Sequence, residues 1–122
     1  MAGRFPLYTD ADVRGPVIEA LISRGWDVVR AIDAFPEGTF DWVHFEHAAR
    51  LDRVLVANDR HMKAMAERWC AEGRSFRGLI WWPMETYACM TAGQFLERFE
   101  ALAAQEQPFA PGYPIVVINP PR

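Results

Sequence analysis

Five short apolar runs, separated by segments with helical periodicity, constrain the fold of this chain more than any other feature. The apolar runs lie within residues 5–8, 26–30, 53–57, 76–82 and 114–118. Between them, apolar residues recur every three or four positions, as on one face of a helix, over residues 13–25, 40–51, 60–73 and 91–103. This alternation predicts an α/β fold, a three-layer α/β/α sandwich with a mostly parallel sheet of about five strands.

The segments between these elements carry residues typical of turns. Residues 31–39 contain Pro and Gly and are predicted to form a loop, and residues 84–91 are predicted to be irregular. Trp42 and Trp69 are in phase with the apolar faces of two predicted helices, so both are expected to pack in the core. Trp81 and Trp82 are adjacent in a strand and should point to opposite faces. An exposed tryptophan there would offer a ring on which a nucleic-acid base stacks.

Length and composition favour one globular domain over residues 1–122. Hydrophobic residues make up 51% of the chain and charged residues 24%, and the net charge of −3 does not indicate nucleic-acid binding by charge alone. The cysteines, Cys70 and Cys89, have no metal-ligand spacing and are expected to be reduced. Residues 1–4 lead into the first strand without a signal-peptide pattern, and no apolar run approaches the roughly 18 residues of a membrane span. We therefore expect a cytoplasmic protein that does not enter a membrane.

Acidic residues follow the predicted strands at the points where ligands bind in parallel sheets. Asp10 and Asp12 come after the first strand, Asp59 follows the third, and Asp41 opens the second long helix. The carboxyl ends of parallel strands meet at one edge of the sheet. Converging carboxylates repel each other unless a cation lies between them, and oxygen ligands suit Mg²⁺ or Mn²⁺. Such a site would hold a phosphate and activate water, the chemistry of a metal-dependent nuclease.

These residues also have other interpretations. Asp is a favoured helix cap, and Asp12, Asp41 and Asp59 each stand near the start of a predicted helix. His44 and His47 have the spacing of a chelating pair for zinc, but no third ligand is visible. A nucleotide-binding protein is disfavoured because no Gly-rich phosphate loop follows any strand.

Four segments together resemble the small, toxin-like, uncharacterised PIN-like domains of bacteria. In that group the first strand ends in an Asp, the second strand is entered through Gly, an aromatic residue and Asp-Val, and the third strand ends in an acid. The matching segments here are residues 7–13 (LYTDADV), 24–29 (RGWDVV), 41–49 with 53–59 (RVLVAND), and Arg74 with 78–80 and Pro83. The resemblance covers roughly residues 5–83.

The resemblance implies a PIN-like fold and a metal-dependent ribonuclease that hydrolyses RNA phosphodiesters, as do the toxins of toxin–antitoxin pairs. Carried over by position, Asp10, Asp41 and Asp59 would be catalytic, and the same three with Asp12 would bind Mg²⁺ or Mn²⁺. Ala11 stands where the group often has Glu, and Ala57 where it often has Thr. The alternative is therefore a catalytically weak PIN-like module that acts by binding a protein, either an antitoxin or its own copy. The apolar surplus and five Trp residues favour a homodimer.

Overall fold

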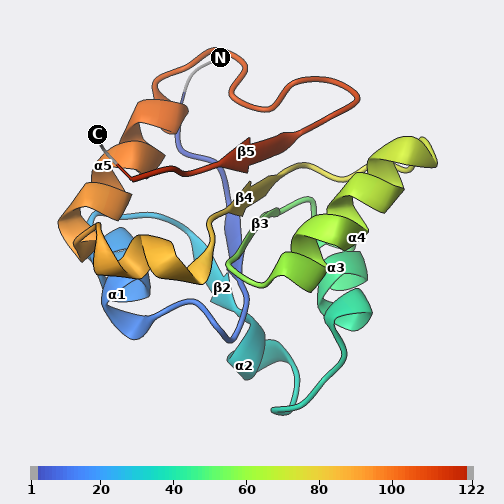
Figure 1. Ribbon diagram of the computed structural model, residues 1–122, viewed down its shortest axis with the longest axis horizontal. Coiled ribbons are helices and arrows are strands. Elements are labelled where there is room, and N and C mark those ends of the chain that lie inside the picture. Colours follow the sequence, from blue (N-terminus) through green and yellow to red (C-terminus); the bar gives the residue numbers. More distant parts are fainter. Residues whose placement is uncertain (1–2, 121–122) are drawn as a thin grey trace.

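The computed structural model describes residues 3–120, so the prediction about the first two residues lies outside the described part. Five strands form one sheet in which every pair of neighbours is parallel. Their order across the sheet is β2-β1-β3-β4-β5 (Figure 1). In chain order the strands are β1 (Leu7–Thr9), β2 (Val28–Arg30), β3 (Val54–Ala57), β4 (Leu79–Trp81) and β5 (Ile115–Val117). The predicted α/β sandwich is confirmed, with a sheet that is wholly parallel.

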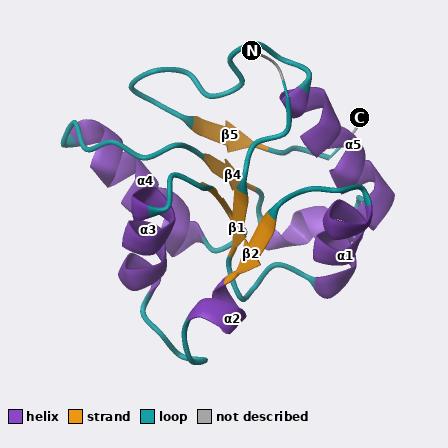
Figure 2. Ribbon diagram, turned by 180° about the vertical axis from the view of Figure 1, so that it is seen from behind, coloured by secondary structure: helices purple, strands orange, loops and turns teal. Residues whose placement is uncertain are grey.

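Helices cover both faces of this sheet. The long helices are α1 (Gly15–Ser23), α3 (Asp41–Arg50), α4 (Arg60–Ala71) and α5 (Ala92–Ala103). Two short elements join them, the four-residue helix α2 (Ala31–Ala34) and the 3-10 helix η1 (Met84–Ala88). Helices α1 and α5 pack together on one face and α3 and α4 on the other, as the two opposite views show (Figures 1 and 2).

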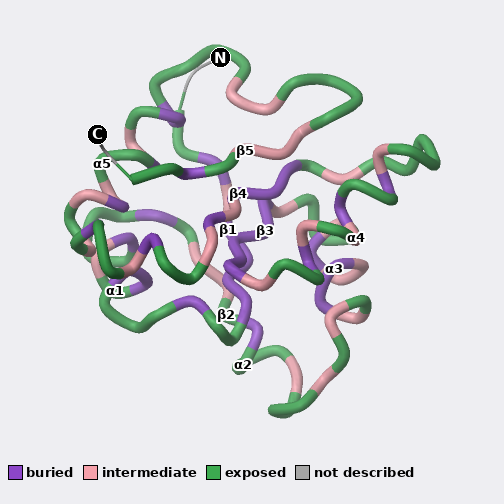
Figure 3. Tube along the Cα trace, in the orientation of Figure 1, coloured by how far each residue is buried: buried purple, intermediate pink, exposed green. Residues whose placement is uncertain are grey.

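The central strands are buried on both faces, which explains why their sequences are continuously apolar. Leu7, Val56 and Ile80 pack toward the α1–α5 layer. Tyr8 and Leu55 pack toward the α3–α4 layer. Each of these residues is no more than 2% exposed, and the burial follows the middle of the sheet (Figure 3). Two cores of different composition therefore hold one sheet between them.

Three local predictions are wrong. Residues 31–34 form α2 instead of loop, because Pro36 and Gly38 confine the turn to the residues that follow. Residues 84–88 form η1 instead of an irregular segment. Trp42 is 54% exposed, because α3 buries His44, Phe45 and Ala48. Phe45 and Ala48 are thus buried as predicted, whereas His44 is buried in place of Trp42.

The other tryptophans follow the predictions more closely. Trp69 packs in the α3–α4 layer. Trp82 is fully buried in the α1–α5 layer, whereas Trp81 is partly buried on the opposite side of the sheet. Of the two, only Trp81 retains exposed surface for a ligand. Within residues 3–120, no helix has both the length and the apolar character needed to cross a bilayer.

Candidate functional site

The strand order places a crevice at the carboxyl ends of β1 and β3. From β1 the chain crosses to β2 on one side of the sheet, then returns past β1 to form β3. Ligands in open parallel sheets bind where the direction of the crossovers reverses. β1 and β3 are paired with Thr9 opposite Val56, so both Asp10 and Asp59 follow their strands at this same edge. The predicted convergence of the first and third strands is therefore present.

Asp10 is the most buried of the four predicted site residues. It is 4% exposed, and its backbone N–H donates to the carbonyl of Val56 at 2.9 Å. Its Oδ1 accepts from the backbone N–H of Ala11 at 2.9 Å. Burial raises the pKa of Asp10 to about 6, although the Ala11 hydrogen bond opposes the rise. Repulsion from Asp12, Asp41 and Asp59 raises it further, so all three carboxylates act on Asp10.

Asp41 and Asp59 enter the site from the starts of two helices. Asp59 is the N-cap of α4, and its Oδ1 accepts from the backbone N–H of His61 at 2.8 Å. The predicted cap at Asp59 is therefore confirmed, and the capping bond uses one of its two oxygens. Asp41 lies in the first turn of α3 behind the N-cap residue Phe40, so it does not cap that helix. Burial raises the pKa of Asp41, as do the charges of Asp59 and Asp12.

Asp12 stands between two cavities at this edge. The cap interpretation is wrong for Asp12, because the N-cap residue of α1 is Arg14. One cavity, of about 320 Å³, is lined by Asp10, Asp12 and Asp41 among others. The other, of about 620 Å³, is lined by Asp12, Asn58, Asp59, Arg60, Trp81, Pro83, Met84 and Glu85. Asp12 thus lines one cavity together with Asp10 and Asp41 and the other together with Asp59.

The four carboxylates suit a hard divalent cation by chemistry, but they are not gathered into a finished ligand set. Within residues 3–120, none of them forms an ion pair with an Arg or Lys. In the same part of the chain, no three His, Cys, Asp or Glu side chains are arranged as metal ligands. The donor set is the oxygen-only kind that Mg²⁺ and Mn²⁺ take. Holding an ion here would require these carboxylates to turn toward it.

Hydrogen bonds that the sequence did not predict connect Asn58, Asp12 and Tyr87, and we call this group the brace. Nδ2 of Asn58 donates to the carbonyl of Asp12 at 3.0 Å and to the hydroxyl of Tyr87 at 2.7 Å. The same hydroxyl accepts from the backbone N–H of Arg14 at 3.1 Å. The brace fixes the loop of Asp12 against the end of β3. Asn58 could have been found by its position after a strand, whereas no sequence signal marks Tyr87.

The predicted histidine pair is divided between two roles in the α3–α4 layer. Nδ1 of His44 forms a hydrogen bond of 3.0 Å with the hydroxyl of Tyr8. The ring of His47 instead packs edge-on against Tyr8 and Phe35, with ring centroids 5.7 Å and 4.9 Å away. His44 also lines the cavity that contains Asp10 and Asp41. The sequence analysis did not place His44 at this site, although its spacing of three residues from Asp41 on one helix is a signal that could have done so.

Comparisons with known proteins add no relative from which function could be transferred. No family model, no curated protein and no solved structure matches this chain. The resemblance to PIN-like domains therefore stays a prediction.

Proposed function

We propose that this chain is a metal-dependent ribonuclease of the PIN-like type, which hydrolyses RNA phosphodiesters with Mg²⁺ or Mn²⁺. Asp10, Asp12, Asp41 and Asp59 would bind the ion. The observation that carries the proposal is the unneutralised set of carboxylates at one sheet edge, three of which raise the pKa of the fourth. Such repulsion costs stability, and a bound cation would remove it.

Each acid contributes a different property to the proposed chemistry. When bound, a divalent ion would polarise a phosphodiester and activate a water molecule. Asp10 is fixed by Ala11 and by β3, so it would define the position of the site. Asp59 keeps one oxygen outside its capping bond, and Asp41 makes no hydrogen bond with its side chain within residues 3–120. Asp41 can therefore reorient at little cost, whereas Asp59 would bind the ion through its free oxygen and keep its capping bond.

Exposed aromatic and basic side chains near the acids support a nucleic-acid substrate. Phe40 and Trp42 flank Asp41 in the sequence and are 71% and 54% exposed, so their rings are free to stack on bases. Arg60 lines the larger cavity beside Trp81 and would contact a phosphate. Trp82 is fully buried and has no part in stacking.

The test is cleavage of a fluorescently labelled RNA by the wild type, with Mn²⁺ and with EDTA. Loss of a residue that only supports a metal ligand costs about 10–100-fold in activity. Because Asp10 and Asp41 are proposed as ligands themselves, Asp10→Asn and Asp41→Asn should each lower the cleavage rate by at least roughly 100-fold. Asp52→Asn is the matched control, since it removes one negative charge far from the site, at the opposite edge. Cleavage that persists in EDTA, or in Asp10→Asn, would contradict the proposal.

The exposed apolar residues also favour a second candidate function. Ile32, Phe40 and Trp42 are each more than half exposed. A catalytically weak module would use such a surface to bind an antitoxin or a second copy of the chain. Light scattering after gel filtration would show a dimer that Trp42→Glu dissociates, with no RNA cleavage by the wild type. Either candidate would act in the cytoplasm. As a ribonuclease, the chain would be the toxin of a toxin–antitoxin pair.

A further inference from the structure

His44 is a buried polar residue that the proposed metal ligands do not explain. It lies on α3 one turn after Asp41 and is 5% exposed. Its partner Tyr8 is fully buried on the central strand β1. Within residues 3–120, the hydroxyl of Tyr8 has one hydrogen-bond partner, Nδ1 of His44, at 3.0 Å.

This single contact, together with the burial of the Tyr8 hydroxyl, indicates which ring nitrogen of His44 carries the hydrogen. A buried hydroxyl needs an acceptor for its hydrogen, and Nδ1 is the acceptor that Tyr8 reaches. In a neutral imidazole whose Nδ1 accepts, the hydrogen lies on Nε2. Tyr8 is fully buried and His44 is 5% exposed, and burial of this degree disfavours the charged form of each group. His44 is therefore a neutral donor through Nε2–H.

Within residues 3–120, the second ring nitrogen of His44 has no hydrogen-bond partner. This nitrogen, Nε2, is not among the unpartnered nitrogens and oxygens that are sealed from solvent. His44 lines the cavity of about 320 Å³ together with the acids Asp10, Asp12, Glu37 and Asp41. The remaining polar side chain of the lining, Thr39, already donates its hydroxyl hydrogen to the carbonyl of Pro36. Nε2–H is thus the free side-chain donor in a cavity otherwise lined by acceptors.

We propose that Nε2–H of His44 donates a hydrogen bond to a non-bridging oxygen of an RNA phosphodiester in this cavity. The proposal rests on the proposed function, because a divalent ion must first offset the carboxylates before an anion can enter. A nitrogen that carries a hydrogen cannot ligate a metal, so His44 is assigned to the substrate and not to the ion. Tyr8 acts as a positioning residue, since it holds the tautomer that donates.

The first test is the tautomer of His44 in the metal-free protein, measured by ¹⁵N NMR of the imidazole nitrogens at pH 7.5. A neutral ring with hydrogen on Nε2 is expected in the wild type. Tyr8→Phe should release the constraint and give a mixture of tautomers. A ring with hydrogen on Nδ1, or a charged ring, would overturn the proposal without reference to metal binding or RNA cleavage.

The second test measures Mg²⁺ affinity and then the affinity for the dinucleotide UpU in the presence of Mg²⁺. The double variant Tyr8→Phe/His44→Leu leaves no orphaned hydroxyl in the core, so it should fold. It should bind Mg²⁺ as the wild type does and UpU about 10-fold more weakly, as expected for loss of one charge-assisted hydrogen bond. His44→Gln places an amide donor near the original Nε2 and should restore most of the affinity. His47→Gln, which alters the neighbouring ring outside the cavity, is the matched control.

Three results of this second test would overturn the assignment. Equal affinity of the wild type and the double variant for UpU would leave His44 as a core residue. A double variant that loses Mg²⁺ binding would make His44 part of the metal site. Failure of the wild type to bind Mg²⁺ at all would contradict both the proposed function and the phosphate subsite. If the wild type binds Mg²⁺ and the double variant keeps the wild-type affinity for UpU, only the phosphate subsite is contradicted.

Discussion

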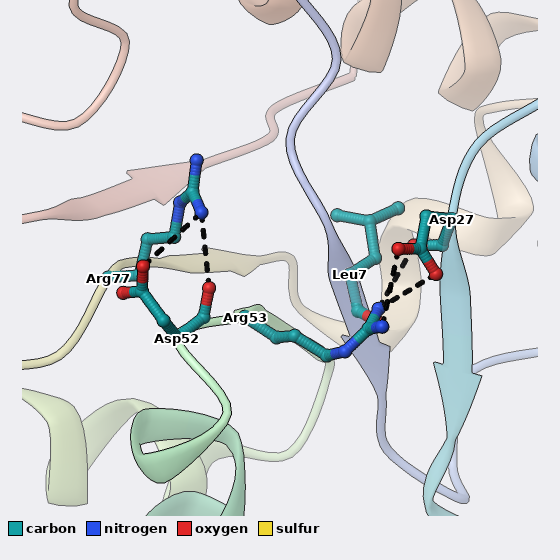
Figure 4. Close-up of polar contacts among 5 residues, drawn as sticks. All are labelled: Leu7, Asp27, Asp52, Arg53 and Arg77. Atoms are coloured by element: carbon teal, nitrogen blue, oxygen red, sulfur yellow. Dashed lines mark hydrogen bonds and ion pairs between the residues drawn. The ribbon is translucent and has the colours of Figure 1, made fainter.

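The two edges of the sheet treat their acidic residues in opposite ways. At the amino edge, Arg53 binds both carboxylate oxygens of Asp27 at 3.0 Å and 3.2 Å and also donates to the carbonyl of Leu7 (Figure 4). Arg77 contacts the carbonyl and carboxylate of Asp52 at the same edge (Figure 4). At the carboxyl edge, the four acids have no such partner within residues 3–120.

The ion-paired side chains at the amino edge therefore stabilise the fold, whereas the clustered carboxylates at the carboxyl edge do not. Paired, mostly exposed acids contribute modestly to folding. Clustered acids without a counter-charge destabilise the metal-free fold, and Asp10 is buried as well. Strain of this kind is typical of sites whose ligand supplies the missing charge. Acid-to-amide substitutions should therefore have opposite signs at the two edges.

The largest effect is expected from Asp10→Asn, which should stabilise the metal-free protein at pH 7.5. The pKa of Asp10 is raised from 3.8 to about 6, so its ionisation is less favourable in the folded chain than in the unfolded chain. Stability consequently falls as the pH rises from about 4 to about 6, and the full cost remains above that range. A shift of that size corresponds to at most about 3 kcal/mol. Urea denaturation in EDTA at pH 7.5 and pH 4.5 should show a gain in the free energy of unfolding at the higher pH that shrinks to about one third at the lower pH. If Asp10→Asn instead destabilised the protein at pH 7.5, the Asp10 carboxylate would be a stabilising group like the paired acids of the amino edge, and the prediction would be wrong.

A smaller effect of opposite sign is expected from Arg53→Met at the amino edge. This substitution keeps most of the side-chain stem but removes the hydrogen bonds to Leu7 and Asp27. The free energy of unfolding should fall by about 1–2 kcal/mol, measured as a lower midpoint in urea. Arg77→Met is the control, because its pair with Asp52 is more exposed. If both variants lost the same free energy of unfolding, the hydrogen bond of Arg53 to the Leu7 carbonyl on β1 would add nothing to stability.

The smallest effects are expected from the amino-edge acids themselves. Asp27→Asn should destabilise the fold by less than about 1 kcal/mol, and 0.5 M NaCl should reduce that difference. Asp52 is the one described non-glycine residue with positive φ, at 55°, which Asn tolerates well. Asp52→Asn should therefore be nearly neutral. Stabilisation by either substitution would remove the contrast between the edges.

Most of the fold could be predicted from the sequence because local patterns and layer architecture agree. Each strand is apolar on both faces, and Asp59 and Thr91 cap their helices as expected. The failure at Trp42 has a physical cause: α3 turns Asp41 and His44 inward, toward the carboxyl edge, instead of its most apolar stripe. Departures from local pattern are expected where side chains serve a site.

The candidate site could be predicted only as far as chain position allows. The rule that ligands lie at the carboxyl ends of strands located Asp10 and Asp59 without any contact information. The brace of Asn58 and Tyr87 joins residues 29 apart in the sequence, and the Tyr8–His44 pair joins residues 36 apart. Neither contact has a local signature, because each depends on how two layers meet.

Titration of Mn²⁺ into the metal-free protein by calorimetry tests the central claim most directly. We expect the wild type and Asp52→Asn to bind the ion alike. Asp10→Asn and Asp59→Asn should each lose at least about 10-fold in affinity, since each removes a ligand from the carboxyl edge. A folded wild type that binds no Mn²⁺, or an Asp52→Asn variant that loses binding as fully as Asp10→Asn, would contradict the account.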